Sequence, residues 1–195
     1  MANTDAAFGF KPVGHALGLD WTQCVNPYYF AAGESTATFK YDLVSLAGSS
    51  DTLGEYPTIA QTAAAGAILG VVIGFSNTPY ISADVTNLAR KYRPASTAMY
   101  GWVVDDPFVI YEAQEDSDTN DMDADMVGLA TDIAVGSGNT TTGISAMELD
   151  SSDTATGAGQ MRILGLVRRG TNALGSYAIW RCMINEHQLR TGTDV

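Results

Sequence analysis

The sequence predicts an all-β protein, mainly an antiparallel β-barrel or sandwich, with one short helix and an extended N-terminal arm. Short runs of β-branched and aromatic residues recur along the chain and are separated by Gly, Asp, Asn and Pro, which is the pattern of strands joined by turns. Of the 195 residues, 46% are hydrophobic and 16% are charged, and no linker divides them. We therefore expect residues 1–22 to form the arm and residues 23–195 to form a single β-rich domain.

The N-terminal arm contains aromatic residues but no sustained periodicity. Phe8 and Phe10 lie among glycines and alanines and are followed by Lys11 and Pro12. Such a segment does not bury its aromatic rings by itself, so the rings either pack on their own domain or dock on another subunit. We take Phe8, Phe10, Lys11 and Pro12 as the candidate residues for contact with another protein or a sister subunit.

The most apolar stretch of the chain predicts a buried strand. The uninterrupted apolar run at 63–75 is too short to span a bilayer, so a membrane partner is not expected. Within it, 68–75 fits a strand that is buried on both faces, and Gly70 and Gly74 are expected to mark bulges or close backbone approach.

One helix is predicted over 82–92. Apolar side chains there recur at i, i+3, i+4 and i+7, which places Val85, Leu88, Ala89 and Tyr92 on one helical face. Pro94 follows and would stop the helix.

The central stretch 99–116 predicts two strands around a turn. Asp105, Asp106 and Pro107 separate two β-rich runs, so we expect a hairpin or a bulged corner, and Trp102 on the first strand is expected in the core. Adjacent strand residues point to opposite faces, so the two aspartates fit a turn better than a catalytic pair. After the turn, 109–114 alternates between a core face and an increasingly wet face.

The charge balance excludes several partners. The chain has 22 acidic and 10 basic residues, a net charge of −12, which repels nucleic acid and anionic lipid. No signal peptide opens the sequence, so a cytoplasmic setting is expected. Asp116, Asp118 and Asn120 are similar to the start of a calcium loop, but Asp121 replaces the required Gly and Val127 replaces the required Glu. A solvated acidic loop is expected, and calcium binding stays an open alternative.

No cofactor, metal or catalytic centre is predicted. Cys24 and Cys182 lack CxxC spacing, and together with His15 and His187 they lack the short paired spacing of a zinc site. We expect both cysteines to be small buried hydrophobes. A Cys-His or Ser-His catalytic machine would need a nucleophile elbow or a recognisable acid, which the sequence lacks.

The order of several short segments resembles the structural proteins that coat the heads of marine tailed phages. The segments are MANTDAAFGFKPVG at 1–14, YDLV at 41–44, YRPA at 92–95, VVDDP at 103–107, YEAQED at 111–116, GISAMELD at 143–150 and INEHQL at 184–189. The resemblance to these capsid decoration, or cement, proteins covers nearly the whole chain.

This resemblance implies a non-enzymatic, often trimeric β domain that is assembled in the host cytoplasm. It would bind the major capsid protein on the outer surface of the virion and stabilise the shell. The chain is longer than the smallest decoration proteins, which leaves open whether it forms homotrimers there. The alternatives are a phage tail or fibre β module, glycan-binding modules included, and an acidic hydrolase that uses Asp105 or Asp106.

Overall fold

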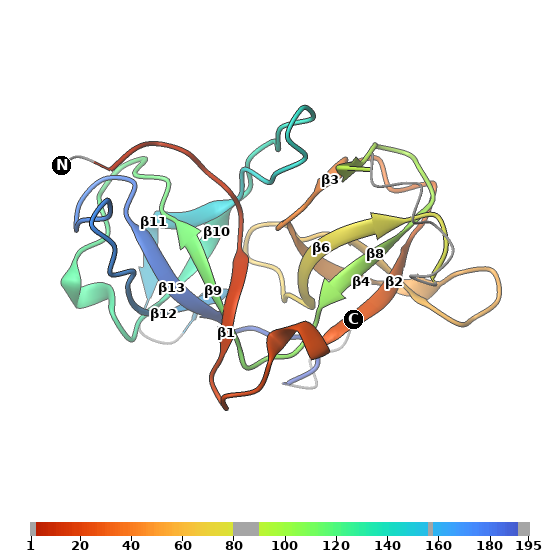
Figure 1. Ribbon diagram of the computed structural model, residues 1–195, viewed down its shortest axis with the longest axis horizontal. Coiled ribbons are helices and arrows are strands. Elements are labelled where there is room, and N and C mark those ends of the chain that lie inside the picture. The colour runs from red at the N-terminus through yellow and green to blue at the C-terminus, as the bar shows by residue number, and fades with distance from the viewer. Residues whose placement is uncertain (1–2, 80–89, 156–157, 191–195) are drawn as a thin grey trace.

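The chain folds into two β structures that lie side by side, a closed five-stranded barrel and a six-stranded antiparallel sheet (Figure 1). The computed structural model describes residues 3–79, 90–155 and 158–190. Nearly all its regular structure is β, which confirms the predicted fold class.

The barrel is built from the first half of the chain. Its strands, in the order in which they pair, are β2 (Val25–Phe30), β5 (Pro57–Gln61), β4 (Leu43–Ser50), β6 (Gly70–Ser76) and β8 (Met99–Val104). Strand β6 lies in the predicted stretch but is fully buried only as far as Val72, so burial on both faces is wrong for Ile73 to Phe75, which are half-buried. Its pairing with β8 shifts between Val72 and Gly74. At Gly70 a Cβ would lie 2.1 Å from the carbonyl oxygen of Val104. Both glycines therefore do what the sequence predicted, a bulge and a close backbone approach.

The six-stranded sheet joins the two ends of the chain. Its strands, in pairing order, are β1 (Lys11–His15), β9 (Val109–Gln114), β13 (Ile179–Ile184), β12 (Met161–Leu166), β10 (Ala130–Ala134) and β11 (Glu148–Ala155). Strand β1 pairs with β9, with Lys11 opposite Glu112. The prediction of an arm without regular structure is thus wrong for residues 11–15.

The remaining elements are short. Strands β3 (Thr38–Phe39) and β7 (Tyr92–Arg93) form a two-stranded ladder, and the helical elements among the described residues are the 3₁₀ turns η1 (Trp21–Gln23) and η3 (Ala124–Met126). Most of the predicted helix falls on residues 80–89, outside the described residues, and its last position, Tyr92, begins a strand instead. No helix in the described part of the chain is long and apolar enough to cross a membrane.

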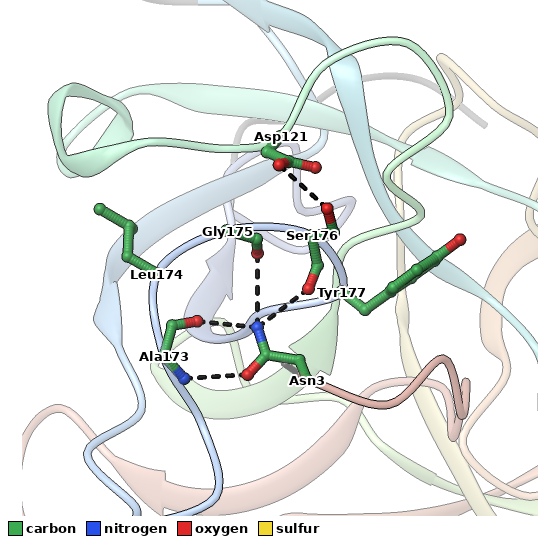
Figure 2. Close-up of a pocket in the computed structure, with 7 residues that line it drawn as sticks. All are labelled: Asn3, Asp121, Ala173, Leu174, Gly175, Ser176 and Tyr177. Carbon is green, nitrogen blue, oxygen red and sulfur yellow. Dashed lines mark hydrogen bonds between the residues drawn. The ribbon is translucent and has the colours of Figure 1, made fainter. Parts of the chain in front are cut away.

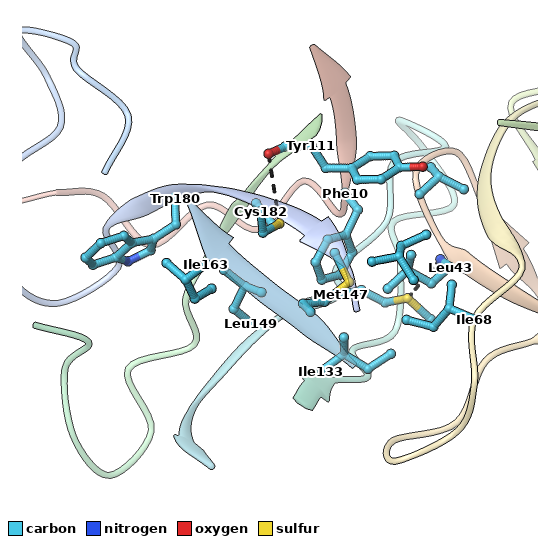
Figure 3. Close-up of a cluster of buried hydrophobic side chains, with 14 of the residues drawn as sticks. Phe10, Leu43, Ile68, Tyr111, Ile133, Met147, Leu149, Ile163, Trp180 and Cys182 are labelled. Carbon is cyan, nitrogen blue, oxygen red and sulfur yellow. Dashed lines mark hydrogen bonds between the residues drawn. The ribbon is translucent and has the colours of Figure 1, made fainter. Parts of the chain in front are cut away.

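Two hydrophobic clusters form the interior. The larger one draws side chains from both β structures and extends from Leu43 and Ile68 of the barrel region to Trp180 of the sheet (Figure 3). The smaller one fills the barrel and contains Phe30, Ile59, Leu69, Val72 and Val103 among others. Trp180 is fully buried, whereas Trp102 is only half-buried, so the prediction that Trp102 belongs to the core is wrong.

The turn between β8 and β9 is a corner and not a hairpin, because β8 belongs to the barrel and β9 to the sheet. On β9, Val109, Tyr111 and Ala113 are buried as the alternation predicted. Glu112 and Gln114, which were expected to be wet, are buried as well. The N-terminal segment explains this for Gln114, because the Gln114 side chain donates to Thr4 O and accepts from Ala6 N–H, both at 2.8 Å.

Candidate functional site

Asp105 at the corner between the barrel and the sheet serves the fold. Its carboxylate accepts hydrogen bonds from Asn26 Nδ2, 3.0 Å from each oxygen, and from the Tyr28 hydroxyl at 2.7 Å. Burial and this carboxylate raise the pKa of the Tyr28 hydroxyl. The carboxylate is therefore occupied by neighbours from β2, which agrees with a structural role for this aspartate.

Asp106 lies in a second polar group that the sequence did not reveal. Its Oδ1 accepts from Phe108 N–H at 2.7 Å and lies 3.2 Å from His15 Nε2, and its Oδ2 lies 3.7 Å from Cys24 Sγ. His15, Cys24 and Asp106 come from three separate segments, and their ligand atoms all lie within 4.8 Å of one another. The geometry therefore raises the question of a metal centre.

The protonation of His15 argues against a metal at this group. Leu17 N–H donates to His15 Nδ1 at 3.1 Å, so in the neutral ring the proton resides on Nε2, which faces Asp106. A metal at Nε2 would move that proton to Nδ1, where it would meet the Leu17 N–H donor. The Leu17 contact therefore favours an imidazole, a carboxylate and a thiol that lie together without a metal.

The same group does not provide an activated nucleophile. Burial, followed by the charge of Asp106, raises the pKa of the Cys24 thiol. A nucleophilic cysteine needs the opposite shift, because the thiolate is the reactive form. Cys182 lies elsewhere, fully buried, with its Sγ 3.9 Å from Tyr111 O, as expected of a small buried hydrophobe. The same expectation is wrong for Cys24, which is only half-buried.

His187 repeats the local geometry of His15. Leu189 N–H donates to His187 Nδ1 at 3.1 Å, in a His-x-Leu sequence like that of 15–17. Burial lowers the pKa of His187 to about 4, so the ring is neutral at neutral pH. The repeated His-x-Leu is a sequence signal that the sequence analysis did not use and that could have predicted this shared local geometry.

The acidic loop lies against a strand that is distant in the sequence. Asp116 and Asp118 meet Asp150 of β11, and one carboxylate oxygen from each lies within 4.8 Å of the others. Asp116 Oδ1 already accepts from Ser151 N–H at 3.0 Å and from Ser151 Oγ at 2.8 Å. These bonds give the carboxylate a structural partner, so calcium binding stays a prediction to be tested.

Two carboxyl groups next to this loop are poorly solvated. Burial raises the pKa of Glu115 to about 7, although Met122 N–H donates to it at 2.6 Å. Burial, followed by the charges of Asp5, Asp116 and Glu115, raises the pKa of Glu148 to about 7. Several carboxyl groups therefore lie close together at this end of the sheet, and the charge of one raises the pKa of another.

The N-terminal segment is fastened to its own chain. Asn3 Nδ2 donates to Ala173 O at 2.8 Å and to Ser176 O at 2.9 Å, and Ser176 Oγ in turn donates to Asp121 Oδ2 at 3.0 Å (Figure 2). At Gly9, whose φ is 74°, a Cβ would lie 2.5 Å from Tyr41 O. The segment therefore follows the surface of the six-stranded sheet too closely to be a free arm.

The candidate contact residues of the arm divide into two pairs. Phe10 is fully buried in the larger hydrophobic cluster and Pro12 is buried in β1, so neither offers a surface to another protein. Phe8 is half-buried and Lys11 is exposed, and a contact through these two stays a prediction. The expectation that Phe10 anchors the chain to a partner is wrong, because its ring fills the interior of its own fold.

Exposed apolar side chains occur on three segments that meet at the corner. Leu17, Leu19, Phe108 and Leu189 are 65%, 61%, 36% and 57% exposed, and we call them the apolar end. Ala16 N–H donates to Phe108 O at 2.8 Å, and Arg190 Cζ lies 5.8 Å from the centre of the Phe108 ring. The loop after β1, the corner and the segment after β13 therefore meet at Phe108.

No known protein family, curated protein or solved structure matches this chain.

Proposed function

We propose that this chain is a non-enzymatic structural protein of a phage virion that binds the outer surface of the capsid and stabilises the head shell. Its partners are the major capsid protein and further copies of itself, in a homotrimer. The observation that carries the proposal is the apolar end. Large apolar side chains that are exposed together on an otherwise acidic chain are typical of a surface that contacts another protein.

The charge of the chain supports an external position on the shell. A net charge of −12 repels packaged DNA, whereas a protein that faces solvent outside the shell gains solubility from it. The corner supports a structural role as well, because Asp105 is held by Asn26 and Tyr28.

Co-sedimentation with undecorated capsids tests the proposal. Leu17→Asp and Leu189→Asp place a charge in the apolar end and should abolish capsid binding while leaving the melting temperature close to that of the wild type. Leu53→Asp is the matched control, because Leu53 is 76% exposed in the loop between β4 and β5 and is not part of the apolar end. Equal capsid binding by all three variants, or binding to free capsid subunits as strong as to assembled shells, would overturn the proposal.

Imaging of intact particles tests the position and the copy number. We expect density for the six-stranded sheet and the barrel on the outer shell, in groups of three, with the apolar end towards the capsid. Density on the tail alone would identify the chain as a tail or fibre module instead.

A further inference from the structure

The outer face of the barrel carries a line of half-buried aromatic rings. Tyr100 and Trp102 are two residues apart on β8 and therefore lie on the same face, with Tyr29 and Pro27 of β2 opposite them. The ring centroid of Tyr100 lies 5.3 Å from that of Tyr29 and 5.4 Å from that of Tyr56. These side chains point away from the interior of the barrel, so part of each ring is accessible to a ligand.

This aromatic line ends in a hollow between two tryptophans. The hollow measures about 400 Å³ and is lined by Trp21, Thr22, Val25, Ile73, Gly74 and Trp102. Its size is within the roughly 300–1,000 Å³ range of small-molecule sites, and its lining is mainly aromatic and apolar, as in such sites. Gly74 has no side chain, and a Cβ there would lie 4.0 Å from Trp102 Cδ1.

Hydrogen bonds hold one wall of the hollow in place. Trp102 Nε1–H donates to Ser76 Oγ at 3.0 Å, and Ser76 Oγ donates to Thr78 O at 2.6 Å. The indole ring of Trp102 is therefore oriented before any ligand arrives, which lowers the entropy cost of binding.

The charges of the chain disfavour an anionic ligand. None of the residues that line the hollow is charged, so none of them forms an ion pair with a ligand. The whole chain carries a net charge of −12, which repels anionic polymers such as nucleic acids and uronate-containing glycans. A neutral polymer meets no such repulsion.

We propose that this hollow and the aromatic line beside it bind a neutral oligosaccharide. A pyranose ring has an apolar C–H face, which fits against an indole or phenol ring, and a rim of hydroxyl groups, which fits the Thr22 hydroxyl and the tyrosine hydroxyls of the line. Successive sugar units of an oligosaccharide can stack on successive rings of the aromatic line on the outer face of the barrel. The proposal does not rest on the capsid-binding function, because the apolar end and the hollow are formed by different side chains.

Titration with cellohexaose, laminarihexaose and chitohexaose tests the proposal, by calorimetry and by tryptophan fluorescence. We expect saturable binding of at least one of these neutral hexasaccharides. A fluorescence change would report mainly on Trp21 and Trp102, because the third tryptophan, Trp180, is fully buried. Trp21→Ala and Trp102→Ala should each weaken binding by about tenfold or more, the scale of one lost aromatic contact. Phe108→Ala removes an aromatic ring at the apolar end and should leave sugar binding unchanged.

The outcomes separate the alternatives. Melting temperatures identify a variant that fails to fold, and Thr22→Ala, at an exposed position, then carries the test in place of Trp102→Ala. Absence of saturable binding to all three sugars, binding that both tryptophan variants retain, or equally tight binding of hexagalacturonate would each overturn the proposal. If Trp21→Ala instead lowers capsid co-sedimentation and no sugar binds, the hollow is a capsid contact. Sugar binding that persists in Leu17→Asp shows that the two surfaces act separately.

Discussion

The side-chain amide of Asn3 and the backbone of Ala173 exchange two hydrogen bonds across 170 residues of chain. Asn3 Nδ2 donates to Ala173 O at 2.8 Å, and Ala173 N–H donates to Asn3 Oδ1 at 2.9 Å (Figure 2). This pair fastens the first described residue of the chain to the loop before β13. The N-terminal segment is therefore part of the folded unit.

Removal of residues 1–12 should prevent stable folding. The deletion takes away the buried ring of Phe10 and part of β1, and Phe10→Ala alone should lower the free energy of unfolding by about 3–5 kcal/mol. Urea denaturation measures both effects. Phe8→Ala, at a half-buried position, is the control and should cost less. A truncated protein with an unchanged urea midpoint would show that the segment is dispensable after all.

The raised pKa of Glu148 predicts a pH dependence of stability. The pKa is about 7 in the folded protein, above the ordinary value of 4.5, so between these values the folded state binds more protons than the unfolded state. The contribution of Glu148 to stability is therefore present at acidic pH and is lost as the pH rises through about 7.

Glu148→Gln should therefore raise the melting temperature at pH 8 and change it little near pH 4.5. His187, with its lowered pKa of about 4, acts in the opposite direction in acid, but it contributes equally to both proteins and cancels in their difference. Glu55→Gln removes one charge at an exposed position and serves as the control. A difference between Glu148→Gln and wild type that is the same at both pH values would refute this account.

Millimolar calcium should leave the melting temperature nearly unchanged. Asp116 Oδ1 already accepts two hydrogen bonds from Ser151. One of the carboxylate oxygens that would bind a calcium ion therefore has hydrogen-bond partners in the protein. A genuine site would stabilise the folded state by mass action. A clear rise that disappears in Asp118→Ala and persists in Asp125→Ala would establish calcium binding at Asp116, Asp118 and Asp150.

Tyr111→Phe should stabilise the protein by about 1 kcal/mol, because the buried Tyr111 hydroxyl has no hydrogen-bond partner among the described residues. Tyr28→Phe is the matched comparison. It removes a hydroxyl that donates to Asp105, so it should cost about 1–3 kcal/mol. Chemical denaturation of both variants checks the pair, and a destabilised Tyr111→Phe would point to a partner for this hydroxyl, such as a buried water.

The local patterns that predicted the fold are those that depend on neighbours in sequence. The alternation of Val109, Tyr111 and Ala113 and the close approach at Gly70 follow from strand geometry, and the structure contains both. The burial of Gln114 did not follow, because the segment that covers it lies more than 100 positions earlier in the chain.

The candidate sites could not be predicted for the same reason, because their residues are distant from one another in the sequence. His15, Cys24 and Asp106 come from β1, the end of η1 and the corner, and only the tertiary fold brings them within 4.8 Å. Asp150 likewise joins Asp116 and Asp118 from a strand that is distant in sequence. Trp102 was misplaced because a large aromatic on a strand fits the core and an outer binding face equally well from sequence alone.

The strand order also determines which of the two β structures is completed first during synthesis on the ribosome. Every barrel strand lies within residues 25–104, so the ribosome releases a complete barrel while the sheet still lacks most of its strands. The sheet places β13 between β9 and β12, and it cannot close until the last strand has emerged. Its long-range pairings impose slow loop closure. Strand β1 is made first and its partner β9 is made directly after the barrel, so β1 stays unpaired in the nascent chain until residues 109–114 have emerged.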